Sequence, residues 1–322
     1  MDMSPTPSTA PPPSAPLQPA VAWRLVRPGF LWVTVAGVLL GLASAAACGC
    51  GFDVGRAALT LVLGLLAHAA ANAWNDHHDA LSGADAANPA PLSPFTGGSR
   101  VIQQGLASAD DARRLALALA ALVVLGGLWL ALHAGGGLVL IGLAGLTLGW
   151  AYSAPPLRLM ARGLGELTVA LAWWLIVVGA DYAERGQWSW VPAASAVPFA
   201  LLVANILLIN GVPDAPYDAR VAKRTLAVRL GPVGVAALYT VLAVLAHGIL
   251  LVLWLAQVPP STAWWGLASG PLALAAAWLL WRHVALGRAV TALRPAIGLT
   301  IGATLVHALA LAAAFAAVAL QR

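Results

Sequence analysis

Charged residues are scarce in this chain of 322 residues, since Asp, Glu, Lys and Arg together make up only 9% of it. A soluble globular domain carries about 25%. Hydrophobic residues reach 61%, and the mean hydropathy is +0.84. These proportions exclude a soluble enzyme and predict an integral membrane protein.

Cysteine is also scarce, because Cys48 and Cys50 are the only two in the chain. No other cysteine is present to complete a metal-binding set with this Cys-x-Cys pair. We therefore expect two free thiols near the end of the first apolar segment.

The first 20 residues contain no Lys or Arg and no apolar run. A secretory signal peptide needs both a basic start and an apolar core, so this region is not one. Its Pro, Ser and Ala content predicts a disordered tail over residues 1–20, which function does not require. Residues 21–322 then form one membrane domain.

Nine apolar segments follow, each long enough for a transmembrane helix of about 20 residues. Their approximate ranges are 30–49, 57–75, 113–132, 136–153, 165–182, 190–209, 233–256, 263–281 and 297–319. We expect an all-α integral membrane fold with nine transmembrane helices in one bundle.

The distribution of basic residues predicts the orientation of that bundle. With the N-terminus in the cytoplasm, only three of the 17 Lys and Arg residues lie outside, and the other 14 lie inside. This bias follows the positive-inside rule, so the basic pI near 9.9 reflects topology and not nucleic-acid binding. We expect a multi-pass protein of the inner (cytoplasmic) membrane with its N-terminus on the cytoplasmic side.

A polar stretch, Asn72 to Asp79, stands at the end of the second apolar segment. Asn72, Asp76 and Asp79 are spaced i, i+4, i+7 and share one face if the helix continues. Carboxylates beside a bilayer are costly, which indicates a function. The topology places this stretch on the cytoplasmic side.

A second polar stretch, Asn210 to Asp218, follows the sixth apolar segment and repeats the pattern. Asn210, Asp214 and Asp218 are spaced i, i+4, i+8. Pro213 and Pro216 lie inside this stretch, and proline breaks helical hydrogen bonding, so we expect this alignment to be less regular.

The two stretches together predict a divalent-cation and diphosphate site. Mg²⁺ takes oxygen ligands, usually one or two carboxylates together with phosphate oxygens. The expected metal ligands are Asp76, Asp79, Asp214 and Asp218. The residues expected to add neutral oxygen donors are Asn72, Asn75 and Asn210. Because the site opens toward a hydrophobic bundle, a diphosphate with a long apolar tail fits it, and an allylic one would ionise there.

Two other interpretations stay open. Single Asp or Asn residues at a helix end are ordinarily solvated caps, and an ion-coupled transporter would also need buried acids. Transporters place ionisable residues near the bilayer midplane, whereas these lie at helix ends, which favours an enzyme.

Several further stretches resemble the UbiA superfamily of membrane prenyltransferases, most closely the 1,4-dihydroxy-2-naphthoate branch of the menaquinone pathway. The similar stretches are Asn72–Asp79 continued by Ser82–Asp85, Phe95–Ser99, Tyr152–Leu157, Arg162–Glu166 and Asp214–Gly231. The resemblance covers nearly everything after the tail.

The resemblance implies a nine-helix bundle with a central cavity beneath cytoplasmic cap loops. It implies a Mg²⁺-dependent transfer of a polyprenyl group from an allylic diphosphate to an aromatic acceptor. The expected acceptor is 1,4-dihydroxy-2-naphthoate, and the alternatives are 4-hydroxybenzoate, homogentisate or another phenolic. The expected partners are the polyprenyl diphosphate, the acceptor and the lipid bilayer. In the naphthoate branch the attacked carbon loses its carboxylate as CO₂.

The resemblance also assigns residues by position. Lys223 and Arg224 match the basic run behind the second motif, and Tyr152 and Ser153 match a polar pair near the reacting centre. Arg27 is a further candidate for a phosphate contact. The alternative for Arg27 and Arg224 is that they only anchor the protein at the membrane interface. The alternative for Tyr152 is that it only ends a helix.

Four remaining polar residues complete the expectations. His77 and His78 point away from the Asp face of a helix, toward solvent. His68, in register with Asp76, either lines the cavity or packs as a satisfied polar residue. Glu166 begins the fifth apolar segment, where a carboxylate favours a helix N-terminus, and we expect a structural role.

Overall fold

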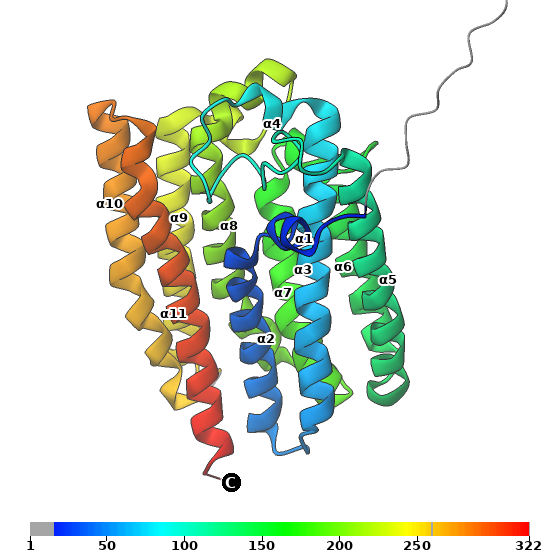
Figure 1. Cartoon of the computed structure of the whole chain (residues 1–322). Helices are drawn as coiled ribbons and strands as arrows, with labels where there is room; N and C mark the ends of the chain where they lie inside the picture. Colours follow the sequence, from blue (N-terminus) through cyan, green and yellow to red (C-terminus); the bar gives the residue numbers. More distant parts are fainter. Residues whose placement is uncertain (1–15, 259, 322) are drawn as a thin grey trace, which may run out of the picture.

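The computed structural model describes residues 16–258 and 260–321, and every regular element within these ranges is helical. The long helices run side by side as one bundle, while α1 lies across it (Figure 1). The helices are α1 (Pro19–Leu25), α2 (Pro28–Cys48), α3 (Val54–Ser82), α4 (Ala84–Ala87), α5 (Ala109–Ala134), α6 (Gly137–Ser153), α7 (Gly165–Arg185), α8 (Trp190–Asp218), α9 (Leu226–Leu255), α10 (Gly270–Leu286) and α11 (Arg294–Ala319). Short 3₁₀ segments are η1 (Leu159–Arg162), η2 (Ala219–Val221), η3 (Ser261–Ser269) and η4 (Val290–Leu293).

Nine apolar helical segments correspond to the nine predicted ones over the described part of the chain. Eight are long and apolar enough to cross a membrane, and α6 is a shorter apolar helix. The predicted tail falls mostly outside the described residues, since only 16–20 are included, and α1 already begins at Pro19.

Helix α3 extends beyond its predicted end at residue 75 and carries the first polar stretch inside its last turns. Asp53 caps its start by accepting a hydrogen bond from the backbone N–H of Arg56. Gly83 ends it with a φ of 76°, a left-handed conformation that glycine adopts without steric cost. The predicted alignment of Asn72, Asp76 and Asp79 on one helix therefore holds.

Helix α8 corrects the expectation for the second polar stretch. It continues through Pro213 and Pro216 to Asp218, so both prolines lie inside a helix. Each proline removes one N–H donor, yet the segment is helical, and its Val212 and Ala215 pack against the core formed with α9 and α11. Asn210, Asp214 and Asp218 thus sit on successive turns of one element.

Packing places α8 at the centre of the bundle. Its Leu208 and Ile209 pack with Tyr239 of α9 and Ile297 of α11, and its Phe199 packs with α2, α7 and α11. Close approach of α2 to α7 depends on Gly41, where an added Cβ would lie 2.2 Å from the carbonyl oxygen of Val177. Small residues allow such contacts between membrane helices.

The loops and α4 gather at one end of the bundle, where α3 and α8 finish (Figure 1). We call this the acidic end. At the opposite end Arg185 binds the buried carboxylate of Asp181 at 2.9 Å, and the backbone N–H of Asp53 donates to Glu184 at 2.9 Å.

The expectation of two free thiols was wrong, because the structure joins Cys48 and Cys50 in a disulfide. Helix α2 ends between them at Gly49, whose φ of 73° turns the chain. The turn leaves their Cα atoms 5.3 Å apart, within the usual range for a disulfide.

Candidate active site

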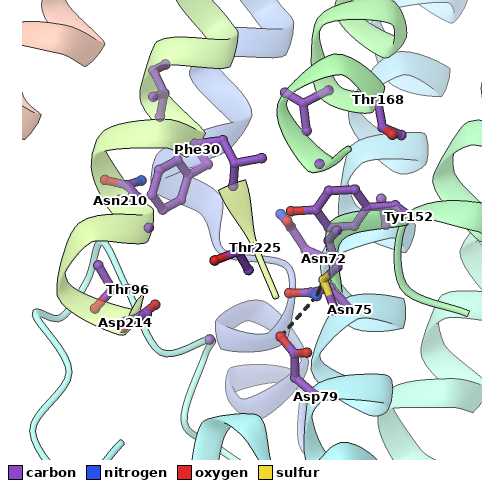
Figure 2. Close-up of a pocket in the computed structure, with 18 of the residues that line it drawn as sticks. Phe30, Asn72, Asn75, Asp79, Thr96, Tyr152, Thr168, Asn210, Asp214 and Thr225 are labelled. Atoms are coloured by element: carbon purple, nitrogen blue, oxygen red, sulfur yellow. Dashed lines mark hydrogen bonds between the residues drawn. The ribbon is translucent and has the colours of Figure 1, made fainter. Parts of the chain in front are cut away.

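A cavity of about 260 Å³ opens between α2, α3, α6, α7 and α8 toward the acidic end. Polar side chains surround its mouth, and Figure 2 shows Asp79 and Asn75 facing Asp214 and Asn210 across it. Apolar and aromatic side chains line its depth, namely Phe30, Val33, Val169, Trp173, Val203, Ile206 and Leu207. The cavity therefore has one polar and one apolar half.

The first polar stretch is held by hydrogen bonds among its own members and α6. Asn75 donates to Asp79 at 3.1 Å and to the hydroxyl of Ser153 at 3.2 Å. Asn72 donates to the carbonyl oxygen of Val26 at 2.9 Å. Asn75 thus links the end of α3 to the end of α6.

Arg27 reaches this stretch from the turn between α1 and α2. Its guanidinium forms an ion pair with the buried carboxylate of Asp76 and donates to Asn75 at 3.1 Å. Burial alone would lower the pKa of Arg27, but the charges of Asp76 and Asp85 outweigh burial and raise it. Arg27 is therefore a permanent cation at the mouth of the cavity.

Asp214 of the second stretch is bound by the loop that follows α4. The side chain of Asn88 donates to it at 2.8 Å, and the backbone N–H of Gly97 donates at 3.2 Å. Two residues further along the same loop, the backbone N–H of Ser99 donates to Asp76 at 3.2 Å. One loop therefore contacts both acidic stretches.

Lys223 joins the two stretches directly. Its Nζ lies 3.1 Å from both carboxylate oxygens of Asp79 and 3.6 Å from Oδ1 of Asp218. Burial acts to lower the pKa of Lys223, but Asp79 and Asp218 outweigh it and raise the pKa above its ordinary value. The ammonium is thus held between carboxylates from α3 and α8.

The turn at Gly97 and Gly98 brings the loop against the carboxylates. Their φ angles are 74° and 70°, in the region that favours glycine. A Cβ at Gly98 would lie 2.6 Å from Oδ2 of Asp85 and 3.0 Å from Oδ1 of Asp76. Any other residue would displace one of these oxygens.

Asp85 is a member of the site that sequence reasoning did not select. It is buried and lines the cavity mouth. Burial, with the charges of Asp79 and Asp76, raises the pKa of Asp85 to about 7. Asn88, Thr96, Gly97 and Gly98 were also missed, although the Gly-Gly pair signalled a special turn.

The predicted site residues divide into those at the cavity and those behind it. The residues that line it are Arg27, Asn72, Asn75, Asp79, Tyr152, Asn210, Asp214, Asp218 and Lys223. Asp76 and Ser153 lie behind this layer, bonded to Arg27 and Asn75. Arg224 is exposed and lies outside the lining.

Hydrogen bonds also fix the positions of Arg100 and His77. Arg100 donates to the backbone carbonyl oxygens of Asp85 and Asn88, so it holds the loop and does not reach the cavity. His77 is buried against the start of α5, with Nδ1 2.8 Å from the carbonyl oxygen of Ala109, and is not on the solvent side as expected.

His68 lies in the apolar half of the cavity. Its Nδ1 is 2.8 Å from the hydroxyl of Thr34, and its ring meets Trp173 edge-on at 4.8 Å between centroids. It lines the cavity and is also bonded to a neighbouring helix, which combines the two interpretations offered for it.

The donor chemistry at the mouth fits Mg²⁺. No three His, Cys, Asp or Glu side chains of the described residues form a metal-binding group by themselves. Mg²⁺ needs only one or two carboxylates when phosphate oxygens and waters supply its other ligands. Asp79 and Asp218, which face the same ammonium group, offer such a pair.

Comparison with known proteins places the chain among membrane prenyltransferases. A sequence model described as the UbiA prenyltransferase family matches residues 30–293. A protein of Mycobacterium tuberculosis named 1,4-dihydroxy-2-naphthoate octaprenyltransferase is 34% identical over 262 residues, covering 80% of this chain and 82% of its own.

Solved structures share the fold. The apo structure of a UbiA homolog from Aeropyrum pernix has a TM-score of 0.68 at 18% identity, covering 86% of this chain and 96% of that one. A UbiA homolog from Archaeoglobus fulgidus, bound to DMAPP and Mg²⁺, has a TM-score of 0.62 at 18% identity, covering 91% and 99%.

Proposed function

The chain belongs to the UbiA prenyltransferase family, and we propose that it transfers a polyprenyl group from an allylic diphosphate to 1,4-dihydroxy-2-naphthoate. The observation that carries the proposal is the division of one cavity into a polar mouth and an apolar depth. A prenyl diphosphate has the same two halves. The likeness to named naphthoate prenyltransferases supports this acceptor.

The polar mouth binds the diphosphate in this proposal. When bound, Mg²⁺ neutralises the diphosphate and stabilises the charge that develops on it as the leaving group. Asp79 and Asp218 would hold Mg²⁺, with Asp214 and the amide oxygens of Asn72, Asn75 and Asn210 as further oxygen donors, while Asp76 supports the mouth from behind through its ion pair with Arg27. Support comes from the homolog of Archaeoglobus fulgidus, whose structure holds DMAPP together with Mg²⁺.

Arg27 and Lys223 are the cations available to the diphosphate oxygens. Both line the mouth, and both are paired with carboxylates of the acidic stretches. Charge-assisted hydrogen bonds from such groups to phosphate oxygens are short and strong. As the C–O bond to the diphosphate breaks, its electron pair leaves with the diphosphate, and these cations stabilise that charge.

The apolar half holds the prenyl chain and the aromatic ring. Phe30, Val169 and Trp173 exclude water from the allylic carbon, so that the ring and not water attacks it. Tyr152 and Ser153 lie at the boundary between the two halves, where we place the reacting carbon. The attacked ring carbon then loses its carboxylate as CO₂.

The protein works in the inner (cytoplasmic) membrane, with the acidic end facing the cytoplasm. Support comes from the basic residues, because within residues 16–258 and 260–321 only Arg56 and Arg185 lie at the opposite end. Water-soluble pyrophosphate is then released into the cytoplasm.

The test uses purified protein in lipid with Mg²⁺ and a radiolabelled prenyl diphosphate. We would offer 1,4-dihydroxy-2-naphthoate, 4-hydroxybenzoate and homogentisate in parallel, with Asp76→Ala and Asp214→Ala as variants. A Mg²⁺-dependent lipid-soluble product from the naphthoate alone, absent in both variants, is the expected result. Product from another acceptor only would overturn the acceptor assignment, and no diphosphate binding would overturn the whole proposal.

A further inference from the structure

Glu166 is a buried carboxylate that the chemistry above does not use. It is 8% exposed and lines the cavity. Its carboxylate accepts a hydrogen bond from its own backbone N–H, and among the described residues it forms no ion pair with another residue and accepts no hydrogen bond from one. Other buried acids are paired, for example Asp79 with Lys223 and Asp181 with Arg185. A role at the start of α7 does not by itself require that this carboxylate line the cavity.

The height of Glu166 in the cavity follows from the helix register. Helices α3 and α7 meet where the rings of His68 and Trp173 lie 4.8 Å apart. They are antiparallel, since α3 ends and α7 begins at the acidic end. Seven residues toward that end, about two turns or 10 Å, lead to Asn75 on α3 and to Glu166 on α7.

Glu166 is therefore level with the boundary between the polar and apolar halves. Asn75 binds Ser153 at 3.2 Å, which places the neighbouring Tyr152 at the same height. The side chain of Tyr152 extends into the cavity, and Thr168 of α7 lies above its ring (Figure 2). Glu166 also interacts electrostatically with Tyr152. Apart from Glu166 and Tyr152, the ionisable side chains that line the cavity are Arg27, His68, Asp79, Asp85, Asp214, Asp218 and Lys223.

We propose that Glu166 is the catalytic base that accepts the proton of the acceptor's hydroxyl group, an inference that rests on the proposed function. A phenol ring attacks more readily once its hydroxyl has ionised. At this height a carboxylate faces the ring and lies beside the allylic carbon, not among the diphosphate oxygens. A positioned base of this kind contributes about 10²–10⁴-fold to rate.

The step balances with the groups already named. The hydroxyl proton moves to Glu166, and the electron pair on oxygen shifts into the ring. The adjacent ring carbon bonds to the allylic carbon, and the diphosphate leaves with the electron pair of the C–O bond. The carbon–carbon bond to the carboxylate then breaks, CO₂ departs, its electron pair restores the aromatic ring, and the oxygen recovers the proton from Glu166.

The test compares wild type with Glu166→Gln and Glu166→Asp, using Glu184→Gln as a matched control. Glu184 is a buried acid on the same helix at the opposite end and lies outside the cavity lining. We expect Glu166→Gln to lower kcat about 100-fold or more, while Mg²⁺-dependent diphosphate binding stays within about twofold. Its kcat should rise with pH as the acceptor ionises by itself. Glu166→Asp should recover part of the rate, and Glu184→Gln should keep the wild-type pH profile.

A second measurement needs no variant. The wild-type enzyme should form no product from an acceptor whose hydroxyl, next to the attacked carbon, is O-methylated, because that oxygen has no proton to give. Product from the methyl ether would overturn the inference, as would Glu166→Gln turning over within threefold of wild type or losing diphosphate binding along with rate.

These outcomes separate the inference from the proposed function. Wild-type product formation decides the proposed function, and the ratio of variant to wild-type rate decides the role of Glu166. If the wild type forms no product with any acceptor, both fall together. If it is active while Glu166→Gln is unimpaired, only the inference falls.

Discussion

The ammonium group of Lys223 lies 3.1 Å from both carboxylate oxygens of Asp79, across 144 residues of sequence. It also lies 3.6 Å from Asp218. One cation therefore occupies the position between the two acidic helix ends. The balance between this cation and the two carboxylates determines how mutation of Lys223 and binding of Mg²⁺ should change stability.

Removing this cation should destabilise the metal-free protein. In Lys223→Met the carboxylates of Asp79 and Asp218 lose their partner while still buried, and breaking a buried pair costs about 3–5 kcal/mol. Mg²⁺ should recover part of the loss by taking its place. Thermal unfolding with and without Mg²⁺ measures both effects, and a melting temperature equal to wild type in the absence of metal would contradict the prediction.

Lys223 is also the only lysine in the chain, so amine acylation reports on this position apart from the N-terminus. We expect slow labelling of the resting protein, because Lys223 is buried. Saturation with Mg²⁺ and prenyl diphosphate should slow labelling further, since the ammonium then also binds phosphate oxygens. Mass spectrometry of the labelled peptide gives the rate, and faster labelling in the presence of both ligands would argue against a diphosphate contact.

Gly98→Ala should abolish Mg²⁺-dependent diphosphate binding. The added Cβ would lie 2.6 Å from Asp85 and 3.0 Å from Asp76, and one carboxylate would have to move. Gly105→Ala is the matched control, because Gly105 has the same φ of 70° but no atom within 4 Å of its Cβ position. Equilibrium binding of labelled diphosphate separates the effect of backbone strain, which both variants share, from the effect of the added Cβ on the carboxylates. Equal losses of affinity in both variants would show that backbone strain alone is responsible.

Asp85 should make Mg²⁺ binding depend on pH near neutrality. Its pKa is raised to about 7 by burial and by Asp79 and Asp76, compared with about 3.9 for an unfolded Asp. Mg²⁺ competes with the proton, so its affinity should rise as the pH increases toward 7, by up to about tenfold per unit.

The stability of the metal-free protein should change in the opposite direction. Between pH 4 and 7 the folded chain keeps a proton on Asp85 that the unfolded chain has lost, so stability falls as the pH rises through this range. Asp85→Asn should remove both dependences. Mg²⁺ titrations and unfolding curves at several pH values check them, and a persistent step in the variant would assign it to another group.

At the opposite end of the bundle, Arg185→Met should reduce stability without changing chemistry. Arg185 binds Asp181 through two hydrogen bonds of 2.9 Å, and Asp181 is 1% exposed. An unpaired buried carboxylate costs about 3–5 kcal/mol. We expect a lower melting temperature with kcat unchanged at a permissive temperature, and the double variant Arg185→Met with Asp181→Leu should recover stability. A changed KM for the diphosphate would show that the two ends are coupled.

Local sequence patterns predicted the nine apolar helices and the first acidic stretch because both depend on spacing along one helix. The i, i+4, i+7 placement of Asn72, Asp76 and Asp79 needed only that α3 continue. The prolines of α8 led us to expect a less regular second stretch, but that segment is helical through Asp218. The disulfide depended on the turn at Gly49, which no periodicity reveals.

The site residues that the sequence patterns did not select join the site through contacts between distant parts of the chain. Asp85 is not in helical register with Asp79, because Gly83 ends α3 between them. Asn88 and Gly97 matter only because the fold brings them to Asp214, 126 and 117 residues away. Arg100 holds this loop by donating to the backbone carbonyl oxygens of Asp85 and Asn88, 15 and 12 residues away.

The loop that binds Asp214 has a consequence for how the enzyme is made. Asn88 and Gly97 are synthesised well before α8, and Lys223 is synthesised after α8. A nascent chain that contains only the first helices therefore has only half of the site. Until α8 has inserted and Lys223 has followed it, Asp79 has no ammonium group beside it. A half-inserted chain therefore cannot hold a prenyl diphosphate, and the growing protein stays catalytically silent until its sixth membrane helix is in place.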